Sequence, residues 1–162
     1  MRIGVIADTH IPDRADDVPQ QILEDFKHCD LILVAGDLTT SFVLQRLKKI
    51  APVTAVFGNM DLPEVVNVLK RKEVITCGRF RIGLFHGFGH PDRLVEQLKN
   101  EFKDDNVDVI IFGHSHRPVN EYVGKTLFFN PGSPTDRVFA PYNSYGIIEV
   151  NDKIKAEIKR LE

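Results

Sequence analysis

Cysteine is scarce in this sequence, and the few cysteines present are not arranged for cross-linking or metal binding. Only two of the 162 residues are cysteines, Cys29 and Cys77, and no CxxC spacing occurs. Two thiols without that spacing cannot build a disulfide framework of the secreted type, nor complete a structural zinc site by themselves. We interpret both as small, reduced core residues.

Excess charge of one sign and long apolar runs are also missing. The formal net charge is −2 and the pI is about 6.3, so the surface as a whole has no basic excess that would attract polyanions. No apolar stretch approaches the roughly 18 residues that cross a bilayer. The N-terminal residues lack the length and cleavage pattern of a signal peptide. We therefore expect a cytoplasmic protein with no membrane partner and no stable nucleic-acid binding.

The composition that remains is that of an ordinary globular chain. Hydrophobic residues make up 43% and charged residues 27% of the sequence, and no repeat, low-complexity tract or linker interrupts it. A chain of 162 residues is long enough for one well-buried domain and short for two. We expect a single domain over residues 1–162, and a homodimer is the default expectation for its oligomeric state.

Apolar runs rich in β-branched residues predict five buried strands in the first two thirds of the chain. They cover residues 3–7, 31–35, 53–57, 81–85 and 107–112. Segments with helical spacing lie between them, at residues 20–27, 40–49 and 91–102. This alternation predicts an α/β fold with a mostly parallel sheet covered by helices.

The last third of the sequence has a different pattern. Four short strands are predicted there, at residues 119–123, 126–129, 144–150 and 153–158, and tight turns join them in pairs. They predict a second, largely antiparallel sheet that packs on the first.

The predicted core strands share a feature, because each is followed by a side chain that could bind a metal ion. In sheets with parallel strands, ligands bind outside the carboxyl ends of the strands, so these side chains could converge in one cleft. Seven donors are too many for one ion, but two ions that share a bridging carboxylate would use all of them. The candidate metal ligands are Asp8, His10, Asp37, Asn59, His86, His114 and His116.

The types of donor indicate which metals to expect. Carboxylate, amide oxygen and neutral imidazole suit manganese, iron, nickel or zinc, and the lack of thiolates argues against a closed structural zinc site. Two ions roughly 3.5–4 Å apart can acidify a shared water and hold both nonbridging oxygens of a phosphoryl group. Each motif alone has an ordinary alternative, such as a turn, a helix cap or a half-buried histidine. Their common position after strands favours the dinuclear interpretation.

The ordered blocks D-x-H, GD, GN, HG and GHSH resemble the signature of calcineurin-like metallophosphoesterases, and within that superfamily the small YfcE-type phosphodiesterase group. The match runs from Asp8 to the "NPGS" at residues 130–133. The resemblance implies a four-layer α-β-β-α sandwich, in which helices flank two packed mixed sheets. It implies that Asp37 bridges two divalent ions. It assigns one ion to Asp8, His10 and His116 and the other to Asn59, His86 and His114.

The resemblance also implies an activity. We expect a phosphodiesterase in which a hydroxide between the two ions attacks a small phosphodiester, with Asp37, Asn59 and His86 as the catalytic residues. Manganese is the expected metal, and nickel, iron or zinc are the alternatives. Two other functions stay open: a non-catalytic protein-interaction scaffold of the retromer small-subunit type, and a phosphomonoesterase.

The sequence departs from the family pattern at Met60. Many members carry a histidine after the asparagine of the GN block, and that histidine is thought to protonate the leaving alkoxide. A thioether cannot do so, and general-acid catalysis is typically worth roughly 10²–10⁴-fold. We therefore expect a preference for good, aryl-like leaving groups. His90 is a candidate substitute acid, with a helix-capping role before Pro91 as the alternative. Residues 130–133 are interpreted as a turn beneath the site.

Overall fold

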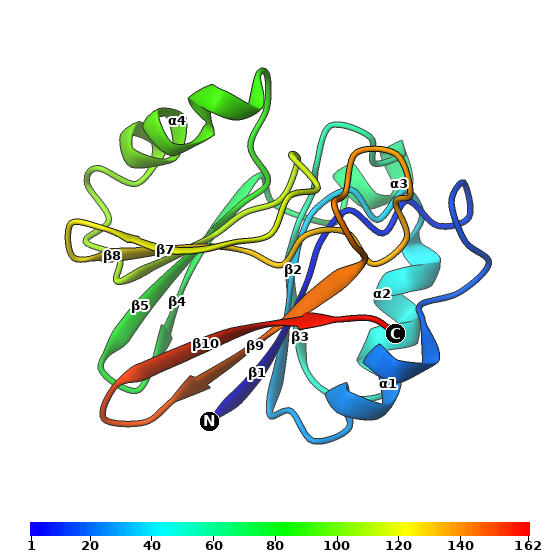
Figure 1. Cartoon of the computed structure of the whole chain (residues 1–162), viewed down its shortest axis with the longest axis horizontal. Helices are drawn as coiled ribbons and strands as arrows, with labels where there is room; N and C mark the ends of the chain where they lie inside the picture. Colours follow the sequence, from blue (N-terminus) through cyan, green and yellow to red (C-terminus); the bar gives the residue numbers. More distant parts are fainter.

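Two five-stranded sheets form the centre of the molecule, in a computed structural model that describes residues 1–162 (Figure 1). The first sheet has the order β10-β9-β1-β2-β3 and the second the order β4-β5-β6-β8-β7. The strands of the first sheet are β1 (Arg2–Ile6), β2 (Leu31–Ala35), β3 (Val53–Val56), β9 (Ser144–Val150) and β10 (Ile154–Arg160). Those of the second are β4 (Lys72–Cys77), β5 (Phe80–Phe85), β6 (Val109–Ile111), β7 (Val119–Val123) and β8 (Thr126–Asn130).

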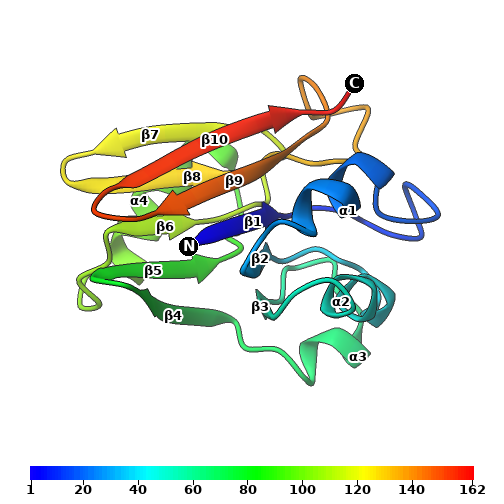
Figure 2. The same ribbon diagram turned by 90° about the horizontal axis from the view of Figure 1, so that it is seen from below.

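Helices cover the outer face of each sheet, which makes four layers. The first sheet is covered by α1 (Gln20–Phe26), α2 (Ser41–Lys48) and α3 (Pro63–Val66). The second is covered by α4 (Leu94–Glu101), which follows a 3-10 turn at Pro91–Arg93. Figure 1 shows α4 on the far side of the second sheet, and Figure 2 shows α1 to α3 together on one side of the strands. The four-layer α-β-β-α sandwich is therefore confirmed. None of the helices combines the length and apolar character that a bilayer crossing requires.

Side-chain alternation along the strands separates the layers. Val34 of β2 packs among the helices, whereas its neighbours Leu33 and Ala35 pack against the second sheet. In β6, Ile110 faces α4 and Ile111 faces the first sheet. Both faces of these strands are buried, and this explains why they are continuous apolar runs rather than alternating ones.

The predicted strands exist, but their predicted division between sheets is wrong. Each sheet is mixed: β1, β2 and β3 are parallel to one another, as are β5, β6 and β8, and the outer strands pair antiparallel. The strands of the last third split, so that β9 and β10 join β1, and β7 and β8 join β6. A local pattern identifies a strand but does not identify its partner, because pairing depends on contacts far apart in the sequence.

Two elements have no counterpart in the sequence-based prediction. Strand β4 lies at the edge of the second sheet and is mostly half-buried, so it lacks an apolar run. Helix α3 is a single turn of four residues, too short for a helical period to be visible. Neither changes the position of the core strands β1, β2, β3, β5 and β6, whose carboxyl ends meet at one rim of the sandwich.

Candidate metal centre

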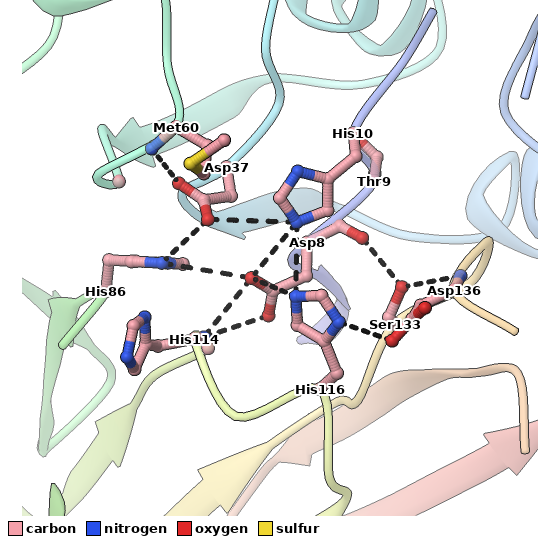
Figure 3. Close-up of polar contacts among 12 residues, drawn as sticks. Asp8, Thr9, His10, Asp37, Met60, His86, His114, His116, Ser133 and Asp136 are labelled. Carbon is pink, nitrogen blue, oxygen red and sulfur yellow. Dashed lines mark hydrogen bonds and ion pairs between the residues drawn. The ribbon is translucent and has the colours of Figure 1, made fainter. Parts of the chain in front are cut away.

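Three side chains from two different sheets meet at this rim (Figure 3). Asp8 and His10 follow β1, and His116 follows β6. The Nε2 atoms of His10 and His116 lie 3.1 Å apart. The Oδ1 atom of Asp8 lies 3.9 Å from the first and 3.4 Å from the second. All three residues are buried, and one ligand atom from each lies within 4.8 Å of the others. This arrangement could hold one cation.

A second group lies beside the first, at the ends of β3, β5 and β6. The Oδ1 atom of Asn59 is 3.2 Å from Nε2 of His86 and 3.2 Å from Nδ1 of His114. The other nitrogen of each ring faces a backbone carbonyl, that of Ala35 for His86 and that of Gly89 for His114, both at 2.7 Å. These carbonyls would hold the outer ring nitrogens protonated, which leaves the inner nitrogens free to bind a cation.

Asp37, after β2, connects the two groups. Its Oδ2 atom lies 3.7 Å from Nε2 of His10 and 3.2 Å from Nε2 of His86, while its Oδ1 atom accepts the backbone N–H of Met60 at 2.8 Å. The Oδ1 atom of Asp8 is also within 3.8 Å of Nε2 of His86. Both carboxylates therefore lie between the histidines of the two groups. The resemblance assigned such a shared position to Asp37 alone.

The charges of this cluster are strongly coupled. Burial opposes a charge on His86, yet the carboxylates of Asp8 and Asp37 outweigh it and raise the pKa of the imidazole to about 9. Burial likewise opposes a charge on Asp37, but His86, the N–H of Met60 and His10 together outweigh it and lower the pKa of that carboxyl. The two buried carboxylates thus demand positive charge beside them, which either protonated imidazole or bound cations can supply.

The backbone is strained where the cluster is built. A positive φ is uncommon for residues other than glycine and costs on the order of 1–3 kcal/mol at each position. Seven non-glycine residues of the chain adopt one, and all but Asn106 belong to the turns at this rim. The six are Asp8 (53°), His10 (45°), Asp37 (53°), Thr39 (77°), His114 (70°) and His116 (57°). Five of these six are predicted metal ligands, so the strain coincides with the predicted site.

Two glycines allow the carboxylates to approach the neighbouring turns. A Cβ atom on Gly113 would lie 2.7 Å from Oδ2 of Asp8, and one on Gly58 would overlap Oδ1 of Asp37. Any side chain at either position would therefore displace a carboxylate from the cluster. This close approach explains the glycine in the GN and GHSH blocks.

Asp136 is the main residue of the site that the sequence did not indicate. Its buried carboxylate faces Nδ1 of His116 at 2.6 Å and accepts Nη1–H of Arg14 at 2.6 Å. It also accepts the backbone N–H groups of residues 138, 139 and 140. Burial would raise the pKa of Asp136, but His116 and the N–H groups of Val138 and Phe139 hold it well below its usual range. No spacing or motif marks this residue, because it follows the NPGS turn in an irregular loop.

Other buried groups hold the turns in place. Asp61 accepts the backbone N–H groups of Asp37, Thr39 and Gly58 at 2.7–3.1 Å, which ties the ends of β2 and β3 together. Below the site, Asn130 donates to the Gly113 carbonyl at 2.9 Å. In Figure 3 the hydroxyl of Ser133 donates a hydrogen bond to the backbone carbonyl of Asp8, at 2.7 Å. The NPGS segment is thus a structural turn under the cluster, as predicted.

A pocket of about 400 Å³ opens over the cluster. Its lining includes the candidate ligands His10, Asp37, Asn59, His114 and His116, together with Asp13, Arg14, Met60, Pro91, Ser115, Arg117 and Phe139. The predicted alternative acid, His90, does not line it. Its ring accepts the N–H of Asp92 at the start of the 3-10 turn, so the helix-capping interpretation is confirmed.

Removing the charge of Asp136 is expected to weaken metal binding. In Asp136→Asn the side chain keeps its size but loses the negative charge that orients His116, and losing such a partner typically lowers metal affinity about 10–100-fold. Titration of the metal-stripped protein with manganese, followed by calorimetry, measures the change. Asp16→Asn removes an exposed carboxylate from the loop after β1 and is the matched control. Equal affinities of the two variants would contradict a role for Asp136.

Known proteins resemble this chain in sequence and in fold. A family model described as the calcineurin-like phosphoesterase superfamily domain matches residues 1–153. A protein of Methanothermobacter thermautotrophicus named "Probable metallophosphoesterase" is 40% identical over 162 residues, which cover 99% of this chain and 92% of that one. A phosphodiesterase of Methanocaldococcus jannaschii is 27% identical over 146 residues, covering 82% and 83% of the two chains. The crystal structure of Entamoeba histolytica Vps29 complexed with Zn²⁺ has a TM-score of 0.77 and 29% identity, and covers 99% of both chains.

Proposed function

Because the chain belongs to the calcineurin-like phosphoesterase superfamily, we propose that it is a dinuclear metal-dependent phosphodiesterase that cleaves small phosphodiesters. One observation carries the proposal: oxygen and imidazole donors from five strand ends converge around two shared carboxylates. Strained backbone and buried charge both cost stability, and their coincidence at one rim favours a functional rather than a structural explanation.

The donor set fits two divalent cations. Asp8, His10 and His116 would hold one, and Asn59, His86 and His114 would hold the other, with Asp37 shared between them. These donors suit manganese first, and nickel, iron or zinc as alternatives. The cations would supply a Lewis acid for the phosphoryl oxygens and lower the pKa of a bound water.

The protein's own residues set how this chemistry proceeds. Asp37 keeps one oxygen facing both histidine groups because the Met60 N–H holds its other oxygen. Asp136 orients the His116 ring from behind. The pocket is also lined by Met60, whose thioether cannot donate a proton. The leaving group must therefore depart without help from that position, and this favours aryl-like esters.

Metal removal and restoration test this proposal. The chain is stripped with a chelator, and manganese, nickel, zinc or magnesium is returned before hydrolysis of bis(4-nitrophenyl) phosphate and 4-nitrophenyl phosphate is measured. We expect no activity in the stripped protein and recovery with manganese, with a higher kcat/KM for the diester. Recovery on the monoester alone would replace the proposal with a phosphomonoesterase.

A protein-interaction scaffold is the second candidate, favoured by the fold shared with Vps29. The donor set distinguishes the two functions, since all seven predicted positions carry side chains able to bind metal and a scaffold has no need to keep them. A metal-loaded protein inactive on every diester and monoester would favour the scaffold.

A further inference from the structure

The pocket over the cluster is also lined by two arginines and an aromatic residue. Arg14 and Phe139 contact Asp136, the carboxylate that faces His116, and Arg117 follows His116 in the chain. None of the three belongs to the candidate metal ligands. Two guanidinium groups and an exposed aromatic ring in one polar pocket suit an anionic ligand that carries a flat ring.

Arg14 is held in place but is not saturated. Its Nη1 atom donates to the buried carboxylate of Asp136 at 2.6 Å, and its other guanidinium N–H groups have no partner in the protein. The side chain is about one third exposed. A guanidinium has five N–H donors in a rigid fork that matches phosphate oxygens. Since Asp136 has already fixed the orientation of Arg14, an anion in the pocket would meet free donors with little loss of side-chain entropy.

Arg117 adds a second charge that no carboxylate neutralises. It follows His116 directly, its side chain is exposed, and it has no ion-pair partner in the protein. Its backbone N–H donates to the Ser115 hydroxyl at 3.3 Å, which fixes the start of the side chain at the pocket wall.

Phe139 is placed beside these charges by the same carboxylate that holds Arg14. Its N–H donates to Oδ2 of Asp136 at 3.0 Å, and its ring centre lies 6.2 Å from that of His116, edge to face. The residue is 65% exposed although it lines a polar pocket. An exposed ring in a pocket that also holds arginines can stack on the base of a nucleotide, while the guanidinium groups bind its phosphates.

We propose that Arg14, Arg117 and Phe139 form a nucleotide subsite, which binds a second phosphate group and an adjoining flat ring of the substrate. This inference rests on the proposed phosphodiesterase function and names its substrate class: nucleotide-type phosphodiesters that carry a phosphate besides the scissile one. The scissile phosphate would lie over the candidate ligands. Arg14 is separated from their inner nitrogens by the Asp136 carboxylate and the His116 ring, and so suits a neighbouring phosphate.

Matched substrates test the subsite. The 4-nitrophenyl ester of thymidine 5′-phosphate is compared with the same ester carrying a 3′-phosphate, so that the leaving group and the scissile bond are identical. With manganese, we expect a kcat/KM about 10-fold higher for the 3′-phosphorylated ester, since a charge-assisted hydrogen bond is worth about one decade of affinity. Arg14→Gln and Arg117→Gln should each bring this ratio towards one.

The ratio of the two kcat/KM values distinguishes the loss of the subsite from a general loss of activity. Arg14→Gln also disturbs Asp136, but a weakened metal site lowers both rates and leaves their ratio unchanged. Arg117→Gln leaves Asp136 untouched. Arg137→Gln is the control, because Arg137 is an exposed arginine of the same loop as Phe139 that does not line the pocket. An equal rate on both esters in the wild type, or an unchanged ratio in both arginine variants, overturns the inference.

A binding measurement keeps the inference independent of turnover. Calorimetry on the manganese-saturated protein compares thymidine 3′,5′-bisphosphate with thymidine 5′-phosphate. We expect the bisphosphate to bind about 10-fold tighter, and this advantage to disappear in Arg117→Gln. Phe139→Ala should weaken both ligands by a similar factor, and unchanged binding would remove the ring from the subsite. If neither ester is hydrolysed, the proposed phosphodiesterase function fails, and the calorimetric comparison alone decides the subsite.

Discussion

Asp37→Asn is expected to remove nearly all phosphodiesterase activity, with a loss of about 10³-fold in kcat/KM, as when a preorganised charge in an active site is lost. The reason is the position of Oδ2 between His10 and His86, at 3.7 and 3.2 Å from their Nε2 atoms. An amide of the same shape has no charge to share between two cations. It also presents a donor N–H group where a second acceptor is needed.

Thermal unfolding gives a second measure of the same substitution. A ligand present at 1,000 times its Kd stabilises the folded state by about 4 kcal/mol. For a chain of this length that corresponds to a rise of about 8–16 °C in Tm. We expect manganese to raise the Tm of the wild type by this amount and that of Asp37→Asn by much less.

The control for Asp37 is Asp104→Asn, which makes the same chemical change at an exposed carboxylate after α4, with no hydrogen bond or ion pair. It should keep both the activity and the manganese-dependent rise in Tm. If Asp37→Asn hydrolysed diesters at a rate comparable to this control, the shared position of Asp37 would have no catalytic meaning, and the dinuclear proposal would be wrong.

Met60→His is expected to raise the hydrolysis of alkyl phosphodiesters by about 10²-fold, at the lower end of what general-acid catalysis supplies. Met60 is an exposed residue that lines the pocket, and its N–H donates to Oδ1 of Asp37 at 2.8 Å. The backbone is therefore fixed beside the cluster, and the exposed position accepts a polar side chain of similar size. An imidazole at this position could protonate the departing alkoxide.

A series of diesters with leaving groups of increasing pKa measures this effect. The hydrolysis rate of the wild type should fall steeply as the pKa of the leaving group rises. The rate of Met60→His should fall much less, because a protonated leaving group departs as an alcohol. Met60→Gln, which has a polar side chain but no acidic proton, is the control and should keep the steep dependence. An identical slope for Met60→His and the wild type would show that position 60 does not reach the leaving group.

The strands and the candidate ligands could both be identified in the sequence for a common reason. Strands such as β2 and β6 are buried on both faces, so they form uninterrupted apolar runs that end abruptly at a polar residue. The side chain after each run, such as Asp37 or His114, is visible for the same reason. Where burial is partial, as in the edge strand β4, this signal disappears and the element was not predicted.

The residues that hold the candidate ligands and their turns in place could not be predicted in the same way. Asp136 acts on His116 from 20 residues away, through an irregular loop that has no period and no motif. Asp61 follows the GN block closely in the sequence, but its three backbone hydrogen bonds join two turns that only the folded sheet brings together. Such contacts depend on the path of the chain in space.

The sequence alone indicated the core strands, the presence of a second sheet and the seven candidate donors that follow the strands, because burial and residue chemistry are properties of each segment by itself. The tertiary structure decided how the remaining strands divide between the sheets, and which groups hold the donors in a strained backbone. It also placed Arg14 and Phe139 on the same carboxylate that orients His116. Those outcomes depend on contacts between segments far apart in the sequence, and the energies of such contacts are not properties of any one segment.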